Sequence, residues 1–434
     1  MRLLEGLDFE RPTILRVRAL TRLGAVRTAK DAVVNAAMHD AGDAERAEMN
    51  TLYAALAVQL RRDDVPTAFE DAALYVDAIR SCTLGAELSL VRAQHAWLLG
   101  DRRAAEAYAA RAARDGNDDG TAIPHLGHVR ALAKSFLATL AEKDARFDLA
   151  AARWREALAA HDTAPLADAW VAGHSTAFLA LLARDFPGAA TPSFLEERIV
   201  RVWWGASITA QLSVALHGLG WARAHDGDDA AALRAFREAA ARAPCAALRV
   251  MALIDHANLA RQCYPGPVAE ECVRSAADAA DELSWQHVDG EQRSVLLFAA
   301  EMMAPLAPRF ARVLLKRFRT MRPSGPASSD GADPRYRCFE MRAEAAVLAA
   351  QGAVDRASAL YRAELEGWRE AGSGPRAAIA AADLYALTRD AADLDAARKA
   401  VLLIPRSWIA RRIARLEHGA STGATPGLTF QSIL

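Results

Sequence analysis

The chain has 434 residues, of which 52% are apolar, and a formal net charge of −1, because 53 Lys and Arg residues nearly cancel 54 Asp and Glu residues. This length exceeds what one ordinary globular core supports, so the chain forms either several globular domains or one extended repeat array. The near-neutral charge excludes a whole-molecule field that would attract nucleic acid or an anionic membrane. A charge-driven partner must therefore meet a local patch.

The apolar residues are mostly Ala and Leu, with few of the β-branched runs that suit a strand, so the composition predicts an all-α fold. At the N-terminus, Glu5 and Asp8 interrupt any apolar segment of the kind found in signal peptides. No uncharged apolar stretch reaches the roughly 18 residues of a membrane span. We therefore expect a cytoplasmic protein with no membrane contact.

The first half of the chain shows a weak repeat of small and aromatic residues at helical spacing. The repeat positions are Gly24, Ala29, Val33 and Ala36, then Ala68 and Ala72 within 52–74, then Gly100, Asp101, Ala105, Ala109 and Ala112, then Phe147, Ala150, Trp154 and Ala157. A single helix pair cannot bury its apolar face alone, so recurring pairs predict a stack of neighbouring units.

Two segments in this half resemble chemical motifs but depart from them. Residues 115–120 read DGNDDG, like the opening of a calcium loop, yet Leu126 replaces the acidic twelfth ligand. His125 and His128 follow without an evident third ligand. The segment 173–177, GHSTA, lacks the second Gly of a nucleophile elbow. We therefore expect no catalytic residue, no metal site and no cofactor.

The rhythm of the repeats breaks at 185–206, where Pro187, Gly188 and Pro192 interrupt helix. The pattern predicts a longer loop, after which Trp203 and Trp204 begin the next helix. Adjacent helical residues point about 100° apart, so these two indoles cannot face the same neighbour. We expect one of them to be exposed on a binding face, which makes Trp203 and Trp204 candidate partner-binding residues.

The best repeat in the chain occupies 216–244. Its defining positions are Leu219, Gly220, Gly227, Asp228, Ala232, Phe236, Ala239 and Pro244. Small Gly220 and Ala232 allow two helices to approach closely, Phe236 fills a groove between neighbouring pairs, and Pro244 ends the second helix. This set resembles the 34-residue tetratricopeptide motif, and weaker copies extend the resemblance over most of the chain. The resemblance implies a right-handed α-α superhelix with a concave face.

The segment 309–322 carries the largest local excess of positive charge. At helical spacing Arg309, Arg312, Lys316 and Arg319 form an outer basic stripe, and the other face is apolar. Such a helix suits phosphates or an acidic protein groove, so these four residues are candidate partner-binding residues. The alternative is a solvated face whose Arg stems cover apolar surface.

The remaining chain divides at 323–334, PSGPASSDGADP, whose composition is typical of a flexible linker. We expect a helical repeat array over 1–322, further helical repeats over 335–418 and a flexible tail over 419–434. Gly352, Ala357 and Tyr361 repeat the same frame in the second array.

Taken together, the sequence predicts a non-enzymatic repeat protein that binds a protein or peptide in a concave groove and acts as a scaffold or regulator. The irregular repeats, followed by a Thr/Gly/Pro segment, also resemble the helical-repeat region of bacterial LuxR-type transcription regulators. Leu428, Thr429, Ile433 and Leu434 resemble the start of the DNA-binding domain that follows this region, although its Pro-Arg-Glu stretch is missing. That resemblance implies a ligand- or peptide-sensing module without its helix-turn-helix. A third hypothesis is nucleic-acid binding by the basic helix.

Overall fold

The computed structural model consists of helices, and no strand occurs among the residues that it describes. The structure describes residues 14, 16–18, 20, 25–36, 42–114, 124–162, 169–203, 209–264, 266–285, 293–321, 334–402 and 404–422. The predicted all-α helical repeat fold is confirmed. The right-handed winding stays a prediction.

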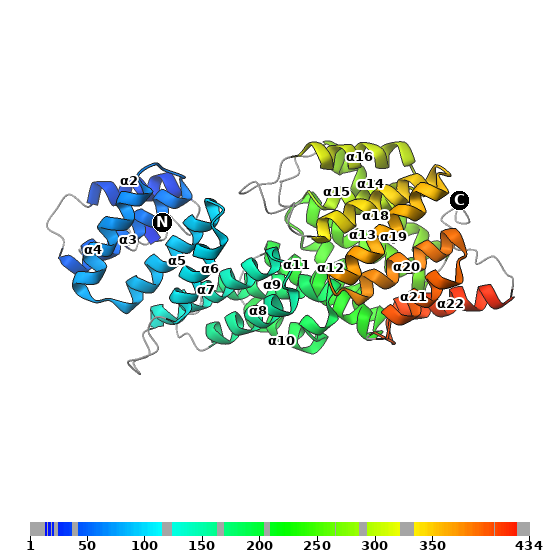
Figure 1. The fold of residues 1–434 in the computed structure, drawn as a ribbon, viewed down its shortest axis with the longest axis horizontal. Helices are drawn as coiled ribbons and strands as arrows, with labels where there is room; N and C mark the ends of the chain where they lie inside the picture. The colour runs from blue at the N-terminus through cyan, green and yellow to red at the C-terminus, as the bar shows by residue number, and fades with distance from the viewer. Residues whose placement is uncertain are drawn as a thin grey trace. The chain divides into compact units, whose positions relative to one another are not determined.

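Contacts divide the chain into two units, of which unit 1 comprises Met1–Leu140 and Glu156–Val171. Its helices, drawn in blue to cyan in Figure 1, are α2 (Val26–Ala36), α3 (Asp43–Gln59), α4 (Val65–Ile79), α5 (Cys82–Leu98), α6 (Arg102–Arg114), most of α7 (Pro124–Lys143) and the end of α8 (Phe147–Asp162). Small alanine-rich clusters, such as Ala93 and Ala109 with Leu137, hold these helices together. Alanine at the contact points allows close helix packing.

Unit 2 comprises Ala141–Arg155 and Ala172–Leu434 and contains the largest buried cluster of the molecule's described part. Its further helices are α9 (Ala169–Asp185), α10 (Pro192–Trp203), α11 (Thr209–Asp226), α12 (Asp229–Ala241), α13 (Ala246–Cys263), α14 (Pro267–Trp285), α15 (Val295–Met303), α16 (Pro308–Thr320), α18 (Pro334–Ala350), α19 (Val354–Glu370), α20 (Gly374–Thr388), α21 (Ala391–Ala400) and α22 (Trp408–Thr422), green to red in Figure 1. A short 3-10 turn spans Pro187–Ala189. Successive helices pack as antiparallel pairs, such as α11 with α12 and α18 with α19.

The same tight turn ends one helix and starts the next at several places in the chain. In each, one residue has a positive φ, and the following N–H donates to the carbonyl five residues earlier. These turns centre on Arg61, Arg80, Gly100, Ala145, Gly227, Gly352 and Gly372. A helix end of this kind provides hydrogen-bond donors for the last carbonyls of the helix, which would otherwise lack a partner. Gly100, Gly227 and Gly352, which are positions of the predicted repeats, thus lie in these turns.

The small and aromatic residues that define the predicted repeats are packed in the interior. Buried positions include Ala29, Val33, Ala68, Ala72, Ala105, Ala109, Ala112, Phe147, Ala150, Trp154, Ala157, Ala232, Phe236, Ala239, Ala357 and Tyr361. A Cβ placed on Gly220 would lie 2.5 Å from the ring of Phe236, so the ring occupies the space that the glycine leaves. The close approach predicted for this pair is confirmed.

The helix boundaries differ from the prediction at two places. Helix α10 begins at Pro192 and ends at Trp203, so Trp203 closes a helix and does not open the next one. Proline is well tolerated at a first helical position, which is why the helix starts earlier than the Pro-Gly content suggested. At the other end, α22 continues to Thr422, beyond the predicted tail start at 419.

The predicted linker 323–334 lies outside the described residues except for Pro334, which begins α18. The boundary drawn there therefore stays a prediction. The helices on its two sides, α16 and α18, contact one another within unit 2.

Candidate functional site

Unit 2 contains a set of buried and half-buried charged and polar side chains, most of which lie on the first helix of a helix pair. We call this set the inner polar network. Its members are Arg184 and Asp185 on α9, His217, Trp221 and His225 on α11, Asp255 on α13, Glu301 on α15, Arg342 on α18, Glu364 on α19, and Arg376 and Asp383 on α20. Burying a charge is costly unless it is paired, so the contacts within this network decide whether unit 2 is stable.

Asp185 is the centre of one half of the network and is 0% exposed. Its Oδ1 accepts hydrogen bonds from Nε of Arg184 at 3.0 Å and from Nε of Arg376 at 2.6 Å. Burial alone would raise the pKa of Asp185, but the two guanidinium groups outweigh burial and hold that pKa well below its usual range. Asp185 is therefore an ionised carboxylate that joins α9 to α20.

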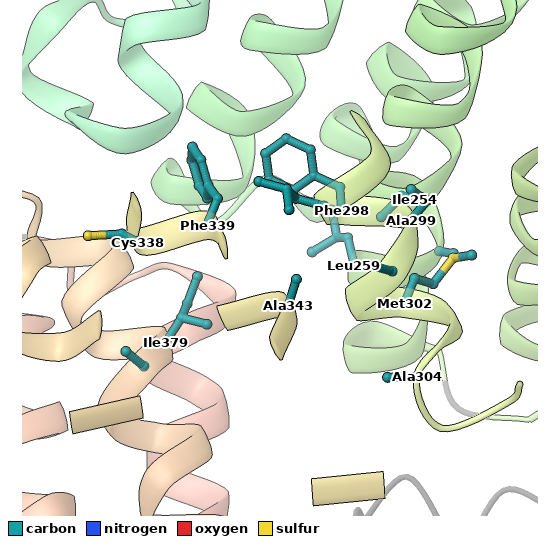
Figure 2. Close-up of a cluster of buried hydrophobic side chains, with 14 of the residues drawn as sticks. Ile254, Leu259, Phe298, Ala299, Met302, Ala304, Cys338, Phe339, Ala343 and Ile379 are labelled. Carbon is teal, nitrogen blue, oxygen red and sulfur yellow. The ribbon is translucent and has the colours of Figure 1, made fainter. Parts of the chain in front are cut away.

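The two arginines that pair with Asp185 are also enclosed by aromatic rings. The guanidinium of Arg184 lies 5.2 Å from the ring centre of Phe298 and 5.2 Å from that of Phe339. Figure 2 shows these two rings next to each other on α15 and α18, and their centres are 4.9 Å apart. Arg376 lies 5.3 Å from the ring centre of Trp221. Ring faces attract cations, so they replace part of the water that the guanidinium groups lose.

Helix α11 carries His217, Trp221 and His225 at successive four-residue spacing. His217 Nε2 lies 2.6 Å from Oδ2 of Asp255, and Trp221 Nε1 donates to the same oxygen at 2.7 Å. His225 Nε2 donates to the carbonyl of Arg184 at 2.9 Å, and burial lowers the pKa of His225 to about 4, so this imidazole is neutral. The pair of His217 and Asp255 has the geometry of an oriented base, but His217 is only 2% exposed.

The second half of the network surrounds Arg342. Its Nε donates to Glu301 at 2.7 Å, its Nη2 to Asp383 at 2.6 Å, and its Nη1 to Glu364 at the longer distance of 3.4 Å. Asp383 also accepts from Arg412 on α22 at 2.5 Å. One guanidinium thus links α15, α18, α19 and α20, and Asp383 extends the link to α22.

Of the three carboxylates around Arg342, Glu364 lies farthest from the guanidinium group. We expect its protonation to make the free energy of unfolding depend on pH. Burial, only partly offset by Arg342, raises the pKa of Glu364 from 4.5 to about 7. The folded chain therefore binds a proton that the unfolded chain has lost, and this stabilising contribution is complete below pH 4.5 and lost as the pH rises through 7. In urea unfolding, the free energy of unfolding of Glu364→Gln, measured relative to that of wild type, should rise by about 2–3 kcal/mol between pH 5 and pH 8.

The matched control for that measurement is Glu366→Gln, two residues further along α19, where the carboxylate is exposed and pairs with Arg369. Surface ion pairs contribute little, so we expect a change of a few tenths of a kcal/mol at either pH. An equal difference between Glu364→Gln and wild type at the two pH values would show that Glu364 is ionised in the folded protein.

The predicted basic stripe lies on α16, as the sequence indicated. Arg309, Arg312 and Lys316 are exposed, and none of them has an ion-pair partner among the described residues. Val313, on the same side of the helix, is 56% exposed. Arg319 differs from the other three because it donates to Glu340 and Glu344 on α18, both at 2.6 Å. The stripe is thus a row of three cations around one exposed valine.

The other face of α16 fixes the position of this row. Ala311, Leu314, Leu315 and Phe318 are buried, and Arg317 donates to the carbonyl of Leu283. The helix is therefore held along its length by apolar contacts, and its outer face is presented on a rigid support.

The remaining sequence candidates fall elsewhere. Trp203 ends α10, its side chain is not described, and Trp204 lies outside the described residues. The 115–120 segment also lies outside them. Ser175, from the elbow-like sequence, is buried in the middle of α9, where no strand precedes it. Across the described ranges no group of three or more His, Cys, Asp or Glu side chains is placed to hold a metal ion.

Sequence reasoning missed the inner polar network. The sequence does contain a signal for this network, because the charged residues Asp255, which is half-buried, and Arg376, which is buried, interrupt the apolar runs 250–260 and 375–385. A charge at a core position of a helix indicates a buried partner, but the partners lie up to 191 residues away, so only the tertiary structure identifies them.

Comparison with protein-family models and with curated proteins finds no match to this chain. Within the described part of the chain, none of the helices combines the length and apolar character that a membrane span requires. The functional assignment therefore depends on the residues themselves.

Proposed function

We propose that this chain is a non-enzymatic helical-repeat protein, related to the tetratricopeptide type, that binds an acidic segment of another protein through the outer face of α16. The recurring helix pairs and their shared turns support a repeat scaffold. The observation that carries the proposal is the row of Arg309, Arg312 and Lys316, exposed and unpaired in the described structure around Val313.

The contrast with the arginines of α22 and of the inner polar network supports this choice. On α22, Arg411, Arg412 and Arg415 all donate to residues of this chain, and the arginines of the inner polar network are paired as well. Arg309, Arg312 and Lys316 lack such a partner within the described residues. An acidic partner would supply it, since complementary charge steers association and fixes register.

A protein partner fits this row better than a nucleic acid does. Arg309 and Lys316 are seven residues apart, which is about 10 Å along a helix, whereas nucleic-acid sites commonly neutralise roughly 6–10 phosphates. The exposed Val313 supplies the apolar contact that is typical of a protein interface.

The test is capture of a partner from an extract of the source cells on immobilised full-length protein. We expect Arg312→Glu combined with Lys316→Glu to reduce recovery of the bound protein at least tenfold, because both charges reverse on an exposed face. The control is Arg234→Glu with Arg237→Glu, exposed on α12 and also on one helix face, which should leave recovery unchanged. Equal recovery in all three proteins, or recovery abolished by nuclease, would contradict the proposal.

A further inference from the structure

Helix α14 carries an acidic outer face. Its exposed charged residues are Glu270, Glu271, Arg274, Asp278, Asp281 and Glu282. Asp278 has no ion-pair partner among the described residues, and Glu282 lies 4.0 Å from Arg249, with both of these side chains about half exposed. Such a surface pair contributes little, so most of the negative charge on α14 is left uncompensated within this chain. We call this face the acidic stripe.

The acidic stripe lies beside the row of Arg309, Arg312 and Lys316 on α16. Arg317 on α16 donates to the carbonyl of Leu283 on α14, and both helices bury their other faces in the same core cluster. Their exposed faces therefore point to the same side of unit 2. Equivalent helices of stacked pairs run in the same direction, so α14 and α16, the second helices of two successive pairs, are parallel (Figure 1).

The hydrogen bond between α16 and α14 also fixes the register of the two helices, because its two residues are 34 positions apart. Arg312 is therefore level with Asp278, to within about one helical turn of roughly 5 Å. Lys316 is level with Glu282 in the same way. The long side chains of Arg and Lys can cover an offset of that size. Opposite charges thus stand at equal heights on two neighbouring helices.

This arrangement is complementary to itself. A two-fold axis that runs between α14 and α16, parallel to both, places the acidic stripe of one copy on the α16 row of a second copy. The rotation keeps the height of every residue, so Arg312 of one copy faces Asp278 of the other, and Lys316 faces Glu282. A two-fold interface is isologous, so each of these contacts forms twice.

We propose that this surface binds a second copy of the chain, with α14 of each copy packed on α16 of the other. The inference rests on the function proposed above, since it names the partner of the α16 row. The two helices present a face about 20 Å long and about 20 Å wide, which is smaller than the roughly 800 Å² per partner of a standard interface. Charge supplies most of the attraction, so the dimer is weak and sensitive to salt.

Sedimentation velocity of the purified full-length protein tests this dimer. At about 100 µM protein and about 50 mM salt we expect a dimer, and about 500 mM salt should weaken it roughly tenfold, because salt screens the exposed charges. Two variants reverse one stripe each, namely Arg312→Glu with Lys316→Glu, and Asp278→Lys with Glu282→Lys. Each should weaken dimerisation at least tenfold, since every contact then joins like charges.

An equimolar mixture of the two reversed variants gives the most specific result. In the mixed pair each reversed stripe meets the opposite charge, so the mixture should form dimers although each variant alone stays monomeric. All four substitutions in one chain should restore the dimer as well. The control is Glu70→Lys with Asp77→Lys, which makes the same change of charge on exposed positions of α4 and should leave the dimer unchanged. Circular dichroism monitors the folding of every variant.

Three results would each overturn the second copy as partner: a monomeric wild type under these conditions, a dimer unchanged by either reversal, or a monomeric mixture of the two reversed variants. The function proposed for α16 is tested separately by the capture experiment. If wild type is monomeric while capture still recovers a protein of different sequence, and this recovery depends on Arg312 and Lys316, only the dimer is refuted.

Discussion

Replacing Asp185 by Ala should lower the free energy of unfolding by about 3–5 kcal/mol, because it leaves Arg184 and Arg376 buried without their shared carboxylate. Aromatic rings surround both guanidinium groups, so water cannot easily replace the lost partner. Urea or guanidinium unfolding followed by circular dichroism measures the loss.

The control for Asp185→Ala is Asp226→Ala. Asp226 occupies the corresponding last position of α11 but is exposed, and we expect a change within about 0.5 kcal/mol. Adding Arg376→Met to Asp185→Ala should recover part of the loss, since it removes one of the orphaned charges. If Asp185→Ala cost no more than Asp226→Ala, the carboxylate would not be the structural centre that the contacts indicate.

Replacing Gly218 by Ala should cost about 3 kcal/mol, the second large effect that the structure predicts. A Cβ on Gly218, in α11, would lie 2.3 Å from both the carbonyl carbon and the carbonyl oxygen of Ala180 in α9. The obstacle is backbone, which has no rotamer to change, so α9 and α11 must move apart.

Gly85→Ala is the comparison variant, and we expect it to change the free energy of unfolding in the opposite direction in the same experiment. Gly85 lies within α5, and its Cβ would meet only Val76 Cγ1, at an ordinary contact distance of 3.9 Å. Alanine is the better helix former, so this variant should gain up to about 1 kcal/mol. A Gly218→Ala protein as stable as Gly85→Ala would show that α9 and α11 are not packed as closely as described.

The sequence predicts much of this fold because the repeat residues act locally. Gly227 lies 7 residues after Gly220, and Phe236 lies 16 residues after it. Their spacing alone indicates the packing that the structure contains. The outward position of Arg312 and Lys316 follows in the same way from helical periodicity and an apolar opposite face.

The inner polar network and the contacts of α22 could not be predicted in this way. The position of Arg376 in α20 indicates a buried charge, but nothing local identifies Asp185 as its partner. Likewise, α22 reads from its sequence as a basic surface helix, whereas Arg411 and Arg412 pair with Asp229 and Asp383. These contacts depend on how the stacked pairs curve, which is a sum of small rotations along the array.

The partner-binding claim is tested most directly by a photo-crosslinking amino acid at position 313 of the full-length protein in the source cells. Val313 lies among Arg309, Arg312 and Lys316 and is exposed, so substitution there leaves the buried face of the helix intact. The control position is Val354, also exposed, at the start of α19. We predict a crosslinked protein at position 313, in a yield that added salt lowers, and none at position 354. A nucleic-acid adduct, or no adduct at position 313, would contradict the proposed binding of a protein partner.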